Sequence, residues 1–371
     1  MGKGKDLSMK MHFFGKEDSE VLSEMRLSQG VYIYGAGDLG RAVKRFLENL
    51  KIPVQSFVVD NEYYHTGMKI MPGNDAAIGL REFLDFSKTN VNNYLIWGIA
   101  SPDKLKNALK QGTISEVWLT YDVCDLWEDH DFAHKHLKEF AQARALFADE
   151  ISLKTFDGYL KIFDGNPIED INNIVDGTYF NELTACKREG CFLDCGAFVG
   201  DTAQQYAKIY GVEQKIYSFE PDTDNYKKLC ENTKELNIVC VNAGCWSENE
   251  QLHFDDCGTG SSCISGSGSS VINVVAIDKI VTDVKVAFVK MDIEGSELQA
   301  LVGMQNIIRR DMPVLAISAY HKQDDLITLP SYIHQFESEA EYYQLYLRHH
   351  GCTTSELVVY AIPTKKNRGK S

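Results

Sequence analysis

The sequence has no long hydrophobic run. No apolar stretch in its 371 residues approaches the roughly 20 residues that a membrane-spanning helix needs. The opening residues, MGKGKDLSMKMHFF, contain no apolar core followed by small residues. We therefore expect neither a membrane span nor a secretory signal, and we expect a cytoplasmic protein.

Positive charge is also scarce. The chain has 38 Lys and Arg against 53 Asp and Glu, a formal net charge of −15 at pH 7. This excess of negative charge would repel a nucleic-acid backbone, so we expect no nucleic-acid partner. The short basic stretch at residues 365–370 is interpreted as a solvated terminus.

Paired cysteine motifs are absent as well. Ten cysteines are present, but none forms a C-x-x-C pair, and those near residue 191 lie on either side of a strand-like run. This spacing argues against a zinc site and against a disulfide framework. We expect reduced cysteines that pack as small hydrophobic side chains.

The chain is long enough for two domains, and the first contains a glycine motif. An apolar run at residues 31–34 precedes Gly35, Gly37 and Gly40, which are spaced G-x-G-x-x-G and followed by helical periodicity. The next apolar run ends at Asp60, where a dinucleotide-binding fold has its ribose-binding acid. A last strand is expected at residues 116–122, which leaves little room for a second mononucleotide half.

Residues 30–122 resemble the small Rossmann-like, nucleotide-sugar-binding domains of polysaccharide-biosynthesis proteins. The resemblance implies a nucleotide or nucleotide-sugar site at Gly35–Gly40 with Asp60. The alternative is a tight strand-to-helix turn retained for packing. We expect a leader at residues 1–28, this small domain at 29–128, a helical connector at 129–178 and a second domain at 179–371.

The second domain opens with FLDCGAFVGDT at residues 192–202, an apolar run that ends in an acid and a glycine turn. The next apolar run, IYSFEP, ends in Glu220 and a proline. Strand and helix patterns then alternate, which predicts a parallel α/β sheet with a site at the carboxyl ends of its strands. Residues 342–347 and 357–362 are expected to complete it as an antiparallel pair.

An inserted pair of strands is expected at residues 251–256 and 272–278. Between them lies a segment rich in glycine and serine, Gly258–Ser270. It is interpreted either as a flexible linker or as a loop that covers the substrate.

DCGAFVGDT, SFEP, VNAGCWS, VAID and FVKMDIEGSE, with a later strand before His321, occur in the order seen in FkbM-type methyltransferases. Residues 179–362 resemble this family. The resemblance implies a class I methyltransferase sheet, mostly parallel with one antiparallel edge strand, and S-adenosylmethionine as cofactor. It also implies O-methylation of a carbohydrate or other small-molecule acceptor, such as a sugar, polysaccharide precursor or polyketide-like product.

The resemblance assigns cofactor-binding residues. Backbone near Gly196 would approach the methionine part, with Asp194 near its ammonium group or a bound water. Glu220 would accept hydrogen bonds from both ribose hydroxyls, and Asn242 and Ala243 would contact adenine. The turn signature is completed by Gly200 and by two residues expected to cap the next helix, Asp201 and Thr202.

The candidates for the reaction are Lys290, Asp292 and Glu294, which alternate along one stretch, and His321 after a later strand. Methyl transfer to a hydroxyl needs in-line alignment and a group that takes the proton. Asp292 or Glu294, with His321, would be that base; alternatively, Asp292 and a second carboxylate would hold Mg²⁺. We favour the metal-free route. Glu297 is a further reactive candidate; in the first turn of a helix, its alternative role is capping and stabilisation of the helix dipole.

Two other function classes remain open. One is a non-catalytic binding or assembly protein with a methyltransferase fold. The other is an NAD(P)-dependent sugar-nucleotide enzyme that uses the first glycine motif. Exposed edge strands would permit a homodimer.

Overall fold

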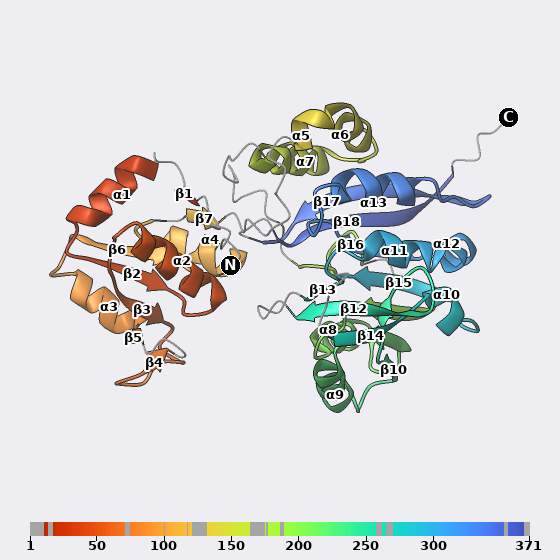
Figure 1. The fold of residues 1–371 in the computed structure, drawn as a ribbon, viewed down its shortest axis with the longest axis horizontal. Helices are drawn as coiled ribbons and strands as arrows, with labels where there is room; N and C mark the ends of the chain where they lie inside the picture. The colour runs from red at the N-terminus through yellow and green to blue at the C-terminus, as the bar shows by residue number, and fades with distance from the viewer. Residues whose placement is uncertain are drawn as a thin grey trace, which may run out of the picture. The chain divides into compact units, whose positions relative to one another are not determined.

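The computed structural model describes residues 11–13, 18–70, 75–99, 101–116, 118–120, 132–163, 175, 177–185, 189–256, 262–264, 270–351 and 355–366. The chain divides into two compact units (Figure 1). Unit 1 comprises Met1–His130, Asp157–Asp176 and Gly351–Ser355. Unit 2 comprises Asp131–Phe156, Gly177–His350 and Glu356–Ser371, so the segment expected as a connector is divided between the units.

Unit 1 is built on a sheet with the strand order β4-β5-β3-β2-β6. Its strands are β2 (Gly30–Tyr34), β3 (Val54–Val59), β4 (Lys69–Ile70), β5 (Asp75–Gly79) and β6 (Asn93–Trp97). All neighbours are parallel except β4 and β5. The strand expected at residues 116–122 does not join this sheet as a full strand. Of its described residues, Glu116 bridges to Ile96, whereas β7 (Trp118–Thr120) pairs with β1 (Met11–Phe13).

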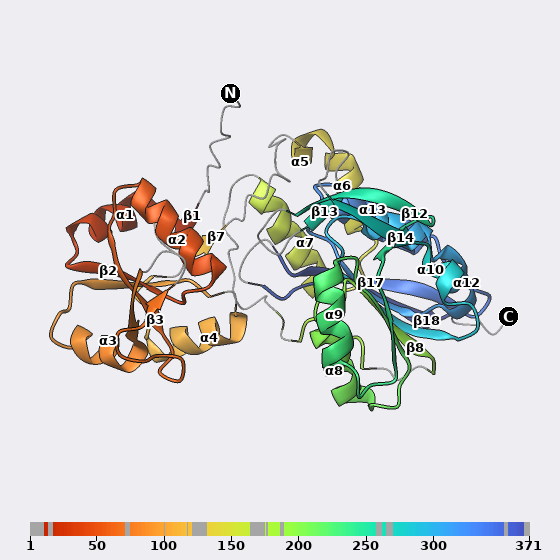
Figure 2. The same cartoon turned by 60° about the horizontal axis from the view of Figure 1, so that its bottom comes forward.

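Helices cover both faces of this sheet (Figure 2). They are α1 (Asp18–Leu27), α2 (Asp38–Asn49), α3 (Leu80–Ser87) and α4 (Pro102–Gln111). Ile33 packs with Val21 of α1 and Val43 of α2, whereas Tyr34 packs with Phe83 of α3 and residues of α4. Neighbouring strand residues face opposite sides, so both sides are buried. Helix α1 lies within the segment expected as a leader and belongs to this core.

Unit 2 is built on a sheet of seven strands in the order β10-β9-β8-β15-β16-β18-β17. They are β8 (Cys191–Cys195), β9 (Ile216–Phe219), β10 (Ile238–Val241), β15 (Val286–Met291), β16 (Val314–Ser318), β17 (Glu341–His349) and β18 (Leu357–Lys365). Only β18 runs antiparallel to its neighbours. The predicted fold class, an α/β protein with a mostly parallel second sheet and a smaller first one, is confirmed. The antiparallel strand was expected at the edge of the sheet. In the structure this strand, β18, is second from the edge, and β17 is the edge strand.

A smaller sheet of four strands, in the order β11-β14-β12-β13, accompanies the main sheet. Its strands are β11 (Gly244–Cys245), β12 (Glu250–Asp256), β13 (Ser262–Ile264) and β14 (Ser270–Val275). The expected inserted pair corresponds to β12 and β14, which are antiparallel. Within the glycine- and serine-rich segment, β13 pairs with β12; most of the rest of that segment lies outside the described residues.

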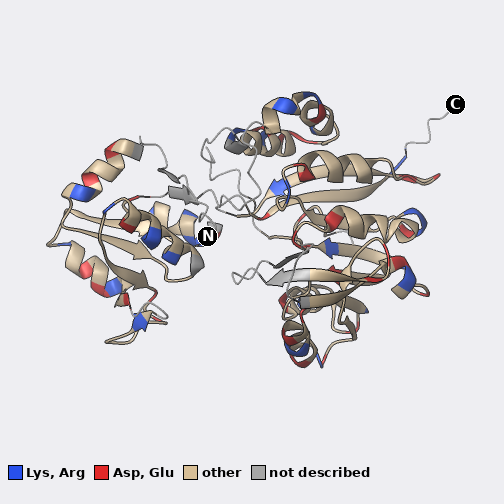
Figure 3. Cartoon of the chain, in the orientation of Figure 1, with Lys and Arg blue, Asp and Glu red and all other residues tan. Residues whose placement is uncertain are grey.

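The helices of the second half are α8 (Asp201–Tyr210), α9 (Thr223–Asn232), α10 (Ile277–Ile280), α11 (Glu297–Val302), α12 (Gln305–Asp311) and α13 (Asp325–His334). The sequence pattern at residues 296–310 predicts a single helix where α11 and α12 occur. The break follows Gly303, where a Cβ atom would lie 1.9 Å from the Trp246 carbonyl oxygen. Charged residues lie mainly on helices and connections, whereas the strands of both large sheets are largely uncharged (Figure 3).

Helices from the expected connector belong to unit 2. They are α5 (Phe132–Lys135), α6 (Leu137–Arg144) and the first half of α7 (Glu150–Phe163). The Ala148 N–H donates to the Leu345 carbonyl of β17 (2.9 Å), so backbone covers part of this edge strand. The homodimer expected from exposed edges stays a prediction. No helix in the described ranges is long and apolar enough to cross a membrane.

Candidate active site

Functional side chains gather where parallel strands β8, β9 and β15 and the adjacent β16 end. The residues that follow these strands are the glycine turn after Cys195, Glu220 after β9, Asp292 after β15 and His321 shortly after β16. Six described non-glycine residues have a left-handed backbone, and four of them border this region: Tyr179, Phe198, Glu294 and Glu356. Such backbone costs free energy and often occurs at functional sites, so it marks this end of the sheet.

The turn after β8 needs glycine at two positions. Gly196 has φ +80, and a Cβ atom there would lie 1.9 Å from the Asp292 carbonyl oxygen. Gly200 has φ +89 and is itself the N-cap of α8, without a side-chain capping bond. The sequence predicted Asp201 and Thr202 as helix caps. In the structure they are instead residues of the first helical turn.

Glu220 is held by backbone from two sides. The Phe198 N–H donates to its Oε2 (2.8 Å), and the Asp222 N–H donates to its Oε1 (2.9 Å). Burial raises the pKa of Glu220 to about 7, although both backbone bonds stabilise its charged form. A carboxylate has about four lone-pair directions, so these bonds leave each oxygen able to accept a hydroxyl.

The residues expected at adenine have other contacts. The Asn242 Nδ2 donates to the carbonyl oxygens of Glu220 (2.9 Å) and Pro221 (3.1 Å), and Ala243 is buried. The Asn242 side chain thus fixes the loop that carries Glu220. Its contact with adenine stays a prediction.

Asp194 and Lys290 form a buried pair beneath the turn. The Lys290 Nζ lies 3.3 Å from Asp194 Oδ1 and donates to the Gly196 carbonyl (2.6 Å). Burial opposes its charge, but Asp194 and Asp292 raise the pKa of Lys290, so its ammonium stays charged. Asp194 was expected beside the cofactor's ammonium group, but its carboxylate has no exposed surface. The pair supports the turn, and the cofactor contact of Asp194 and the catalytic role of Lys290 stay predictions.

Asp292 is surrounded by hydroxyl and imidazole groups. The Tyr179 hydroxyl donates to its Oδ2 (2.9 Å), and the Tyr320 hydroxyl donates to its Oδ1 (3.2 Å). Burial favours the protonated carboxyl, but Lys290, His321 and the Tyr179 hydroxyl hold the pKa of Asp292 below its usual range. Neither tyrosine was identified from the sequence.

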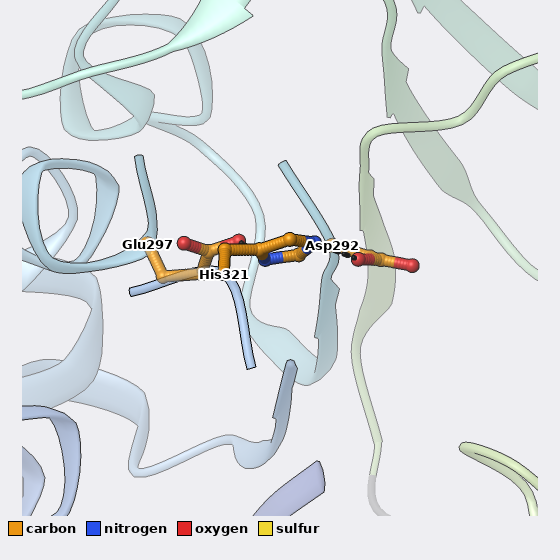
Figure 4. A group of neighbouring side chains, drawn as sticks. All are labelled: Asp292, Glu297 and His321. Atoms are coloured by element: carbon orange, nitrogen blue, oxygen red, sulfur yellow. Dashed lines mark ion pairs between the residues drawn. The ribbon is translucent and has the colours of Figure 1, made fainter. Parts of the chain in front are cut away.

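His321 lies between two carboxylates (Figure 4). Its Nδ1 is 2.9 Å from Glu297 Oε1, and its Nε2 is 3.4 Å from Asp292 Oδ1 and 3.5 Å from Glu294 Oε2. Asp292, Glu297 and His321 could supply three metal ligands. However, the two carboxylates face different ring nitrogens, so one ion bound to either nitrogen would not also meet both of them. The arrangement suits a protonated imidazole better than a metal ion.

Comparisons with known proteins concern the same part of the chain. Residues 194–351 match the methyltransferase FkbM domain family. The hexuronic acid methyltransferase AglP of Haloferax volcanii is 28% identical over 188 residues, which cover 44% of this chain and 77% of that protein. The C-terminal part of this chain is an FkbM-family methyltransferase domain. The family implies S-adenosylmethionine as the methyl donor.

A solved structure is similar in fold over most of the chain. The crystal structure of methyltransferase FkbM from Methylobacillus flagellatus KT has a TM-score of 0.58 and 21% sequence identity, and the match covers 92% of this chain and 93% of that one. At this identity the likeness shows the fold alone. Its coverage means that the likeness extends beyond the FkbM domain into unit 1.

The FkbM domain brings most of the predicted site residues to one end of its sheet. Those with exposed or partly exposed side chains are Asp201, Asn242, Asp292 and Glu294, and Glu220 and His321 lie just beneath the surface. One acidic residue was missed. Glu356 precedes β18, whose Leu357 carbonyl accepts the Ala319 N–H, so Glu356 lies beside Tyr320. In the sequence, Glu356 is recognisable only as an acid that precedes a strand. That position does not reveal that it lies beside Tyr320.

Outside the FkbM domain, the glycine motif of unit 1 is partly explained by packing. A Cβ atom on Gly40 would lie 2.1 Å from the Gly35 carbonyl oxygen, whereas one on Gly37 would have nothing within 4 Å. The Asp60 carboxylate already contacts the Tyr34 hydroxyl and, at 2.7 Å, Lys104 Nζ. A ribose would have to compete for it. The nucleotide site at Gly35, Gly37, Gly40 and Asp60 stays a prediction.

Proposed function

We propose that the FkbM domain transfers a methyl group from S-adenosylmethionine to a hydroxyl of a sugar or sugar-containing acceptor. The observation that carries the proposal is the buried carboxylate of Glu220 beside the turn at Gly196. Glu220 lies at the same end of the sheet as Asp292 and Glu294, which follow β15, and His321, which follows β16. The hexuronic acid methyltransferase of Haloferax volcanii supports a sugar as the acceptor.

The residues at the first two strand ends fit the cofactor. Glu220 is costly to bury as an anion, and two ribose hydroxyls would stabilise its charge by charge-assisted hydrogen bonds. The exposed ring of Phe198 follows the turn and would border the same ligand. When bound, the cofactor supplies an activated methyl group; the chain supplies its orientation.

The residues after β15 and β16 fit the acceptor. A hydroxyl that gains a methyl group must lose its proton, and Asp292 and Glu294 are the carboxylates nearest to the surface there. The Tyr179 and Tyr320 hydroxyls fix Asp292, which keeps the acceptor side rigid. Metal-free proton transfer therefore remains the route we favour.

Isothermal titration calorimetry with S-adenosylmethionine tests the proposal. Wild-type protein should bind, and Glu220→Gln should weaken binding roughly 10- to 100-fold, since hydrogen bonds to a charged group contribute about 1.5–3 kcal/mol. Glu248→Gln is the matched control, because Glu248 is exposed in the same unit. No binding by wild type, or equal affinity of wild type and Glu220→Gln, would contradict the proposal.

A further inference from the structure

The acid–histidine contact at the start of α11 is fixed more firmly than a surface ion pair. Glu297 is fully buried, and its Oε1 accepts the Ile293 N–H (3.0 Å) while lying 2.9 Å from His321 Nδ1. Its Oε2 is buried without a hydrogen-bond partner among the described residues. The buried carboxylate of Glu297 is kept away from solvent, so its interaction with His321 is not screened by water.

The other side of the ring faces the acceptor groups. His321 Nε2 lies within 3.5 Å of both Asp292 and Glu294. Asp292 is already engaged by two tyrosine hydroxyls. Glu294 is the most exposed of the carboxylates around the ring, with 38% of its side chain accessible.

We propose that Glu297 is a positioning residue: it holds His321 through Nδ1 as a doubly protonated ring whose Nε2–H faces Asp292 and Glu294. His321 is then a hydrogen-bond donor, and the base is Glu294. This inference rests on the proposed methyl transfer to a hydroxyl. In that step the acceptor oxygen bonds to the methyl carbon, the carbon–sulfur bond leaves its electron pair on sulfur, and the hydroxyl proton passes to the Glu294 carboxylate.

The charges around the ring support this division of roles. Burial favours neutral imidazole, but Glu297, Asp292 and Glu294 outweigh it and raise the pKa of His321 to about 10. Burial raises the pKa of Glu294, which makes it a better proton acceptor than Asp292.

The other ionisable groups around His321 do not change this balance. They include Tyr320, whose ring centroid lies 4.1 Å from that of His321, Lys290 of β15, Asp325 of α13 and Glu356 before β18. Asp325 accepts the backbone N–H of His321 (2.9 Å), and burial raises its pKa to about 8. Lys290 is paired with Asp194. The negative charge that acts directly on the ring therefore comes mainly from Glu297 and its two partners on the Nε2 side.

Histidine NMR on the full-length, ligand-free protein tests the proposal without an acceptor. The His321 ring signals are assigned by their loss in His321→Gln. In wild type, His321 should remain protonated above pH 8. Glu297→Gln keeps the size of the side chain but removes its charge, so it should lower the titration midpoint by at least about one pH unit. Glu248→Gln, at an exposed position, should leave the midpoint unchanged.

Two outcomes overturn the proposal: a neutral His321 at pH 7 in wild type, or an unchanged midpoint in Glu297→Gln. The wild-type titration decides the charge state even if Glu297→Gln does not fold, and Glu297→Asp, which shortens the side chain, then tests the contact. Calorimetry with S-adenosylmethionine keeps the two proposals apart. Protein that binds no cofactor but keeps His321 protonated would refute the proposed function, not the role of Glu297.

Discussion

At the scale of single residues, the proposed contact of Glu220 with the cofactor predicts that binding depends on pH. Its pKa is raised to about 7 by burial, so the free protein holds much of this carboxyl in the protonated form at neutral pH. Ribose hydroxyls donate best to the ionised form. Affinity for S-adenosylmethionine should therefore rise with pH and be about tenfold weaker at pH 6 than at pH 8.

Calorimetry at a series of pH values checks this dependence. The cofactor has ionisable groups of its own, so Glu220→Gln serves as the reference. Protonation of the cofactor affects binding to both proteins, but the variant lacks the Glu220 carboxyl. The difference between the two profiles should bend near pH 7. Parallel profiles would show that Glu220 is ionised throughout, or that it does not contact the cofactor.

The sequence locates individual site residues when they follow a strand, but it does not give their partners. Glu220, Asp292 and His321 were identified because apolar runs end beside them, and parallel strand ends meet at one edge. The hydrogen bond from Tyr179 to Asp292 joins positions 113 residues apart, and no local pattern reports it. The sequence also does not reveal that Asp194 is buried. The pattern from Asp194 to Gly196 is the same whether the acid faces a ligand or pairs with Lys290 below the turn.

At the scale of elements, strands with flanking glycine turns were predicted well, whereas ends and breaks depended on neighbours. The strand predicted at Cys191–Asp194 is β8, because continuous apolar residues suit a strand buried on both faces. The break between α11 and α12 reflects the close approach of the Trp246 carbonyl to Gly303. Such a contact is a tertiary constraint, and helical periodicity continues through it.

The turn between β2 and α2 gives a prediction about two glycines of one motif. Gly37 is the N-cap of α2, with extended backbone and no capping side chain, so Gly37→Ser should stabilise unit 1 by up to about 1 kcal/mol. Gly40 lies inside the helix, where alanine is intrinsically better by about 1 kcal/mol. Gly40→Ala should nevertheless destabilise by about 1–3 kcal/mol, because its Cβ would meet the Gly35 carbonyl.

Calorimetric unfolding of the full chain measures both variants, with the transition of unit 1 followed separately because two units need not unfold together. The test is whether the two substitutions change the free energy of unfolding in opposite directions. Equal loss of stability in both variants would mean that the whole motif is retained for packing. A stable Gly40→Ala would contradict the close approach of helix and strand.

At the scale of the whole molecule, residues before the FkbM domain complete its sheet. Arg348 of β17 is buried, and its guanidinium donates to Asp149 Oδ2 (2.5 Å) and to Ser152 Oγ (2.9 Å). Ser152 also accepts the Leu347 N–H (2.9 Å). Phe140 and Phe156 are buried in the helices that carry these contacts. From sequence these helices looked like a connector, because amphipathic periodicity does not say which sheet a helix covers.

This arrangement predicts where the chain can be cut. A fragment of residues 131–371 should unfold cooperatively and bind S-adenosylmethionine with nearly the affinity of the full chain. A fragment of residues 179–371, which starts at the boundary expected from sequence, loses the partners of Arg348. The buried Arg348 guanidinium would then lack its carboxylate partner, and leaving a buried charge unpaired is strongly destabilising. Circular dichroism melts should show a much lower midpoint for this shorter fragment, and calorimetry should show weaker binding. Equal melting and binding of the two fragments would mean that residues 131–178 are dispensable, and that the sheet of the FkbM domain is stable without the helices on its last strand.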